Sequence, residues 1–92
     1  MDKMDLLEYL QAYHKTEDEA ISAYELGELF NLDKRGVRLV VTDLRANGFT
    51  VCSSNAGYWY SEDEADVSKT IRRLQAQING TQRAVDGMRG SL

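Results

Sequence analysis

The fold is decided by residues 22–48, which read SAYELGELFNLDKRGVRLVVTDLRANG. Leu26 and Phe30 are apolar and lie four residues apart, which is helical spacing, and a second set of apolar residues at helical spacing follows after residue 31. Gly27 is small where a second helix would cross closely, and Asn31 is a residue that tolerates the left-handed turn conformation. The stretch therefore predicts two short helices joined by a tight turn. The expected inward face of the second helix consists of Leu32, Val37, Val40 and Leu44.

Three local signals mark the ends of these two helices. Ser22 followed by Glu25 predicts a capping box at the start of the first one. Asp33 predicts the N-cap of the second helix, because its carboxylate can accept from the free N–H groups of the first turn. Asn47 and Gly48 predict the end of that helix, with Gly48 in the left-handed conformation that closes a last turn.

A β-hairpin is expected directly after the second helix. Residues 49–53 (FTVCS) and 58–60 (YWY) are β-prone, and the turn-forming run 54–57 (SNAG) separates them. The segment 20–21 is expected to add a minimal third strand. This order of helices and strands is that of a winged helix-turn-helix, so the sequence predicts an α+β fold that is mostly α, with residues 1–60 as the winged-helix domain.

The chain is expected to begin with another helix, over Asp5 to Lys15. Its inward residues are expected to be Met4, Leu7, Leu10 and Tyr13, which recur at helical spacing. The tyrosines and tryptophan of the hairpin, Tyr58, Trp59 and Tyr60, are expected to pack rather than to stack on bases, because single-strand binders interleave aromatic with basic residues.

Residues 61–92 are expected to form one long C-terminal helix, a candidate dimerisation element. Ser61 and Glu64 predict a second capping box at its start. Apolar or neutral residues then recur at alternating steps of four and three, which is the heptad spacing of a helical seam. These seam residues are Val67, Ile71, Leu74, Ile78, Thr81, Val85, Met88 and Leu92.

Three fates are open for this helix. Its distal half pairs with a second copy in a symmetric homodimer, or it frays from Gly80, or the helix packs back on the hairpin and the first helix. Gly80, Gly87 and Gly90 each weaken a helix by about 1 kcal/mol relative to alanine. All three lie away from the seam, so they leave it continuous.

Basic residues mark the outward face of the second helix of residues 22–48. The chain has a net charge of −4, which counts against general nucleic-acid affinity. However, its acids gather in residues 1–28 and 61–66, and charge is screened over about 8 Å at physiological salt. We therefore expect residues 33–47 to be a recognition helix that binds duplex DNA modestly and salt-sensitively. The expected contact residues are Lys34, Arg35, Arg38 and Thr42, with Ser54 and Asn55 at the hairpin tip.

A second interpretation remains open, in which the same fold binds protein. Leu39 falls beside the basic residues rather than toward the core, and the first third of the chain is acidic. Both features suit an adaptor for a replication or transcription protein, or an inhibitor of a nucleic-acid enzyme.

Catalysis and cofactors are not expected. The sequence has no Gly-rich phosphate loop, no nucleophile elbow and no paired histidines. Its single cysteine, Cys52, has no Cys or His neighbour with which to bind a metal and no partner for a disulfide, which fits a reducing cytoplasm. No run of apolar residues is long enough to span a membrane.

The hairpin carries a resemblance to a known family. The string VCSSNAGYW at residues 51–59, followed by an acidic helix start and an Arg-containing helix, resembles small winged-helix proteins encoded in phages and prophages of Gram-positive bacteria. The similarity covers roughly residues 20–85. It implies a DNA-associated phage protein. We expect such a protein to act in transcription regulation or DNA replication.

Overall fold

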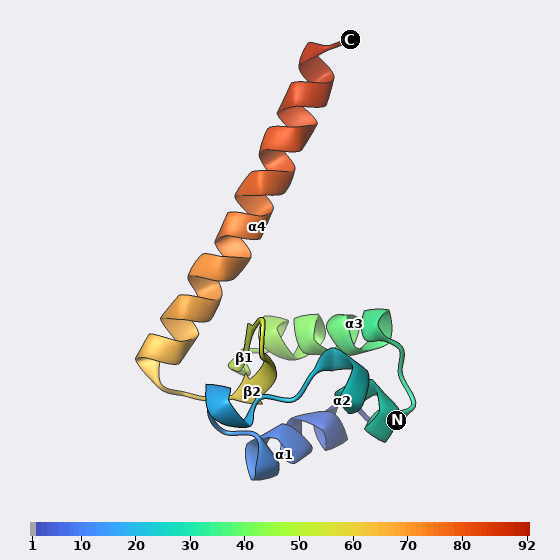
Figure 1. The fold of residues 1–92 in the computed structure, drawn as a ribbon, viewed down its shortest axis with the longest axis vertical. Helices are drawn as coiled ribbons and strands as arrows, with labels where there is room; N and C mark the ends of the chain where they lie inside the picture. The colour runs from blue at the N-terminus through green and yellow to red at the C-terminus, as the bar shows by residue number, and fades with distance from the viewer. Residues whose placement is uncertain (1) are drawn as a thin grey trace.

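A computed structural model describes residues 2–92, and Met1, the first residue of the expected domain 1–60, lies outside the described residues. The described chain is α+β and mostly helical, with a two-stranded antiparallel sheet (Figure 1). This layout is compatible with a small winged helix. In chain order its elements are α1 (Lys3–Tyr13), the 3₁₀ turn η1 (Glu17–Glu19), α2 (Ala23–Phe30), α3 (Lys34–Ala46), β1 (Val51–Ser54), β2 (Gly57–Tyr60) and α4 (Glu64–Gly90).

The predicted N-cap residues of α2 and α3, Ser22 and Asp33, are confirmed. The Ser22 hydroxyl accepts from the Glu25 N–H at 3.1 Å, and the Asp33 carboxylate accepts from the Gly36 N–H at 2.7 Å. Asn31 takes the left-handed conformation between the two helices, with φ of 57°. The crossing is close, because a Cβ at Gly27 would lie 2.3 Å from the Leu32 carbonyl oxygen. The turn therefore requires glycine at this position.

Two predicted inward residues of the helices are corrected. Tyr13 is 65% exposed, because it lies at the last turn of α1, beyond the edge of the core, where its ring packs on Tyr9. In α3, Val41 rather than Val40 is fully buried, and Val40 packs at the margin of the core. The burial pattern of α3 is thus centred between Val37 and Leu44.

The bounds of α1 also differ from the expected residues 5–15. The helix starts earlier because the Asp2 carboxylate caps it by accepting from the Met4 N–H at 3.0 Å. It stops earlier because the His14 carbonyl leaves the helix and accepts from the Tyr60 N–H at 2.8 Å. The end of α1 is therefore decided by its contact with β2.

The hairpin is tighter than expected. Strand β1 begins at Val51 rather than Phe49, because Gly48 has φ of 90° and the Phe49 N–H still bonds to the Leu44 carbonyl. Only two residues, 55 and 56, separate the strands, and the register pairs Cys52 with Trp59. The expected third strand is confirmed as a single bridge between Ile21 and Tyr58, with N···O distances of 2.9 and 2.8 Å.

One core joins the three N-terminal helices to the hairpin. Leucines from α1 pack against α2, α3 and the bridge residue Ile21. Trp59, the largest buried side chain, lies in the hairpin on strand β2. The buried hydrophobic residues are Leu6, Leu7, Leu10, Ile21, Leu26, Val37, Val41, Leu44, Val51, Cys52 and Trp59. The aromatic residues of the hairpin thus serve packing, as expected.

Helix α4 is a single helix of 27 residues that continues through Gly80 and Gly87. Its N-cap is Asp63, which accepts from the N–H groups of Ala65 and Asp66, so the predicted capping box of Ser61 and Glu64 is wrong. Ser61 instead accepts from the Asp63 N–H and so orients the capping residue.

The chain divides into a head (residues 2–74) and a tail (residues 75–92). Within the head, the start of α4 is fixed to the hairpin: the Thr70 hydroxyl accepts from the Ser53 N–H at 3.4 Å, and the Trp59 indole donates to Asp66 at 3.4 Å. Every residue of the tail is exposed. Figure 1 shows α4 leaning over the side of α3 and projecting far beyond the rest of the molecule.

Candidate nucleic-acid interface

The outward face of α3 carries the four residues that the sequence singled out. Lys34, Arg35, Arg38 and Thr42 are all exposed, because Val37, Val41 and Leu44 hold the opposite face in the core. The Thr42 hydroxyl donates to the Arg38 carbonyl at 2.8 Å, which leaves its oxygen free to accept. The helix thus presents three cations to solvent along its first turn and a half.

The hairpin tip is held by bonds from three sides. Ser54 accepts from the Ala56 N–H at 3.1 Å, and Asn55 accepts from Arg73 of α4 at 3.4 Å. The Ser54 hydroxyl and the ammonium of Lys69 hold the pKa of the Glu17 carboxyl below its ordinary value. The tip is therefore positioned by α4 and η1, as well as by its own turn.

Tertiary structure brings α3, the hairpin tip and α4 around one groove of about 550 Å³. Of the expected contact residues it contains Arg38, Thr42, Ser54 and Asn55, whereas Lys34 and Arg35 lie outside it, nearer the start of α3. Its full lining is Ser22, Ala23, Arg38, Thr42, Arg45, Ser53, Ser54, Asn55, Ala56, Gly57, Tyr58, Arg73, Leu74 and Gln77. Among residues 2–92, three guanidinium groups and no carboxylate line this space, which we call the arginine groove.

Arg45 was not among the predicted site residues, yet it lies at the floor of the arginine groove. Its Nε donates to the Val51 carbonyl at 2.8 Å and its Nη2 donates to the Ser53 hydroxyl at 3.0 Å. Burial lowers the pKa of this guanidinium, although an arginine stays charged at neutral pH. The helical spacing of residues 38, 42 and 45 places all three on one face, and this signal could have identified Arg45.

Arg73 is the second groove residue outside the predicted contact set. It is half-buried, and it enters the arginine groove from α4 beside Asn55. Its neighbour Arg72 is exposed. No local pattern distinguishes the two arginines, because their difference depends on how α4 packs against β1.

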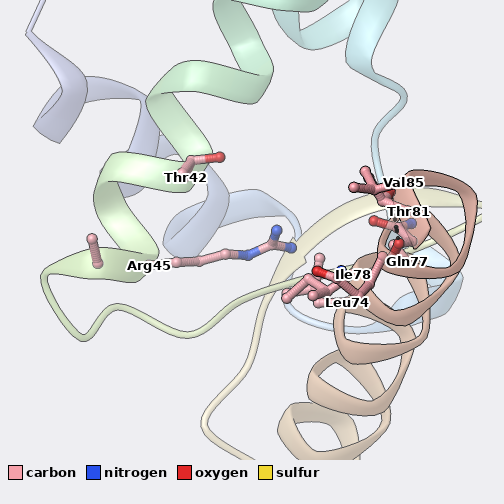
Figure 2. A pocket seen from close by; sticks show the side chains of 9 residues that line it. Thr42, Arg45, Leu74, Gln77, Ile78, Thr81 and Val85 are labelled. Carbon is pink, nitrogen blue, oxygen red and sulfur yellow. Dashed lines mark hydrogen bonds between the residues drawn. The ribbon is translucent and has the colours of Figure 1, made fainter. Parts of the chain in front are cut away.

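A second hollow of about 690 Å³ lies between α3 and α4, and we call it the notch. In Figure 2 the seam residues of α4 face Arg45 across an open gap. Of the five residues predicted as the principal dimer seam, Leu74, Ile78 and Val85 line the notch, whereas Ile71 and Met88 do not. The complete lining is Thr42, Arg45, Ala46, Leu74, Gln77, Ile78, Thr81, Gln82 and Val85.

The remaining candidates have ordinary surroundings. Leu39 is 61% exposed, as its position beside the basic residues predicted. Cys52 is buried, and burial raises the pKa of its thiol. Within residues 2–92, no group of three or more His, Cys, Asp or Glu residues is placed to hold a metal ion. Across the same residues, no helix combines the length and apolar character that crossing a membrane requires.

Compared with protein-family models, curated proteins and solved structures, the chain matches none of them.

Proposed function

We propose that this chain is a non-enzymatic winged-helix protein that binds duplex DNA, with α3 as its recognition helix and the β1–β2 hairpin as its wing. In such proteins the second helix of the helix-turn-helix enters the major groove. The resemblance of the hairpin implies a phage or prophage protein, and the proposed role is transcription regulation or DNA replication in the bacterial cytoplasm.

The observation that carries this proposal is the arginine groove. Arg38, Arg45 and Arg73 come from two different helices, and the groove contains no carboxylate to neutralise them. A guanidinium binds phosphate oxygens through parallel N–H donors, so such a cluster suits a phosphate backbone. Ser54 and Asn55 add neutral polar groups of the kind that contact phosphate and sugar.

The exposed residues of α3 take different roles in this proposal. Arg38 faces outward in mid-helix and also borders the groove, so it is the residue assigned to a base edge. Lys34 and Arg35 lie at the start of α3 and are assigned to phosphates, which fix orientation without reading sequence. Because the assigned contacts are mainly ionic contacts to phosphates, the affinity is expected to fall steeply with salt, and the net charge of −4 is expected to keep it modest.

The test compares Arg38→Glu with Arg83→Glu. Both substitutions remove one exposed arginine and change the net charge equally, but Arg83 lies in the tail, outside the arginine groove. Fluorescence anisotropy of a mixed-sequence duplex, titrated at several salt concentrations, measures affinity and salt slope. We expect Arg38→Glu to weaken binding at least about tenfold and to lower the salt slope by about one. Equal effects of the two substitutions would contradict the assigned interface.

The second candidate function is a protein adaptor, or an inhibitor of a nucleic-acid enzyme. It is favoured by Leu39, a large apolar side chain that stands 61% exposed beside the cations of α3. Absence of binding to any duplex, even at low salt, would favour this function. A partner captured from host lysate should then be lost with Leu39→Asp and kept with Leu29→Asp, a matched change at an exposed leucine of α2.

A further inference from the structure

The tail gives this molecule more surface than a compact chain of its size. Its accessible surface is 6393 Å², whereas a compact monomer of the same mass exposes about 5,400 Å². Its radius of gyration is 14.8 Å, against about 12 Å for a compact domain of this length. The excess surface of about 1,000 Å² exceeds the roughly 800 Å² that each partner buries in a standard interface.

The apolar part of that surface points in a defined direction. Leu74, Ile78 and Val85 face the C-terminal half of α3 across the notch, where Thr42, Arg45 and the small side chain of Ala46 form the opposite wall. Figure 2 shows these α4 side chains directed into the gap rather than away from the head. Any helix that covers the seam must therefore lie partly between α4 and α3.

We propose that the notch holds α4 of a second copy of this chain, so that the dimer interface combines the seam of α4 with the outer face of α3 around Ala46. A two-fold dimer uses the same patch on both partners, and the seam is continuous over the whole tail. The residues that flank it in the notch, Gln77 and Gln82, are uncharged and create no repulsion between identical chains.

This pairing does not depend on DNA binding. The notch and the arginine groove share Thr42, Arg45, Leu74 and Gln77, so the two sites adjoin. Ile78 belongs to the notch alone. Pairing can therefore be disrupted at Ile78 without removing any residue of the arginine groove, and it can be measured without DNA.

The first experiment compares Ile78→Asp with Ala76→Asp by sedimentation equilibrium. Both positions are exposed in the single chain, so neither change removes a core contact, and Ala76 lies on the opposite side of α4 from the seam. We expect the wild type and Ala76→Asp to have twice the 10.4 kDa mass of one chain, and Ile78→Asp to have the mass of one chain. A wild type that stays monomeric up to about 100 μM would overturn the proposal, because it would exclude even a micromolar dimer.

A second pair of variants tests the α3 wall of the notch. Ala46→Glu places a charge in the notch, and Ala12→Glu makes the same change at an exposed alanine of α1. We expect Ala46→Glu alone to raise the dissociation constant of the dimer at least about tenfold. If Ala46→Glu dimerises as tightly as Ala12→Glu, pairing does not use the notch and the proposal fails. If dimers form but Arg38→Glu leaves DNA affinity unchanged, only the DNA-binding proposal fails.

Discussion

The head and the tail use apolar residues in opposite ways. The head packs eleven hydrophobic residues into a core that is buried within one chain. The tail repeats Ile78, Val85 and Met88 at regular helical spacing, yet all three stay exposed. A buried apolar side chain stabilises the fold to which it belongs, whereas an exposed apolar row gains free energy only when another surface covers it. The residues that fold the head are thus distinct from those that the proposed dimer would cover.

The largest expected effect compares one side chain from each region. Trp59 is 1% exposed and Ile78 is 61% exposed. We expect Trp59→Ala to reduce the free energy of unfolding by about 3–5 kcal/mol, because it leaves a cavity under the sheet. At concentrations where the chain is monomeric, Ile78→Ala should change the free energy of unfolding by less than about 0.5 kcal/mol. Urea denaturation monitored by circular dichroism measures the free energy of unfolding of both variants. Similar decreases for Trp59→Ala and Ile78→Ala would show that head and tail share one cooperative core.

A smaller effect is expected from the same substitution at two glycines, with opposite signs. Gly27→Ala forces a Cβ to within 2.3 Å of the Leu32 carbonyl oxygen, so it should destabilise the head by about 1–3 kcal/mol. At Gly80 a Cβ meets nothing within 4 Å. Gly80→Ala should therefore increase the helicity of α4, since alanine is favoured over glycine by about 1 kcal/mol in a helix. Loss of helicity in Gly80→Ala would contradict the continuous helix that the tail forms.

The smallest effect concerns thiol reactivity and leaves stability unchanged. Burial raises the pKa of the Cys52 thiol, so at about pH 8 its thiolate fraction is smaller than that of a free cysteine, whose pKa is about 8.5. We expect the native protein to react slowly with a thiol reagent and to react rapidly in urea. Ser91→Cys, at an exposed position of the tail, supplies the control and should show one fast and one slow thiol. If both thiols of the folded Ser91→Cys variant reacted rapidly, Cys52 would be accessible and the head would open readily.

Local chemistry made the middle of the head predictable. Asn31, Asp33 and Gly48 each satisfy a conformational or capping demand within a few residues of their own position, and the structure confirms all three. The hairpin and the long C-terminal helix were predictable for the same reason. Such signals do not depend on distant parts of the chain.

The errors arose where a distant contact or a competing neighbour decided the outcome. The end of α1 moved because the His14 carbonyl bonds to Tyr60 of β2. At the start of α4 the N-cap is Asp63 rather than the predicted capping box of Ser61 and Glu64, because the Asp63 carboxylate accepts from two N–H groups of the first turn. The periodicity of apolar residues predicted which side of α3 faces the core, but not that Val41 is more deeply buried than Val40. The burial of these two residues depends on the elements packed against them.

The sequence by itself determined the order of the elements, the turn at Asn31, the basic face of α3 and the apolar seam of α4. Each of these features depends only on residues that are close together along the chain. Only the tertiary structure decided that Arg45 and Arg73 join Arg38 in one groove, and that the seam of α4 faces α3 across the notch. Both arrangements depend on the direction in which α4 leaves the hairpin. That direction is set by Thr70 and Asp66 packing on β1 and Trp59, contacts that no local pattern encodes.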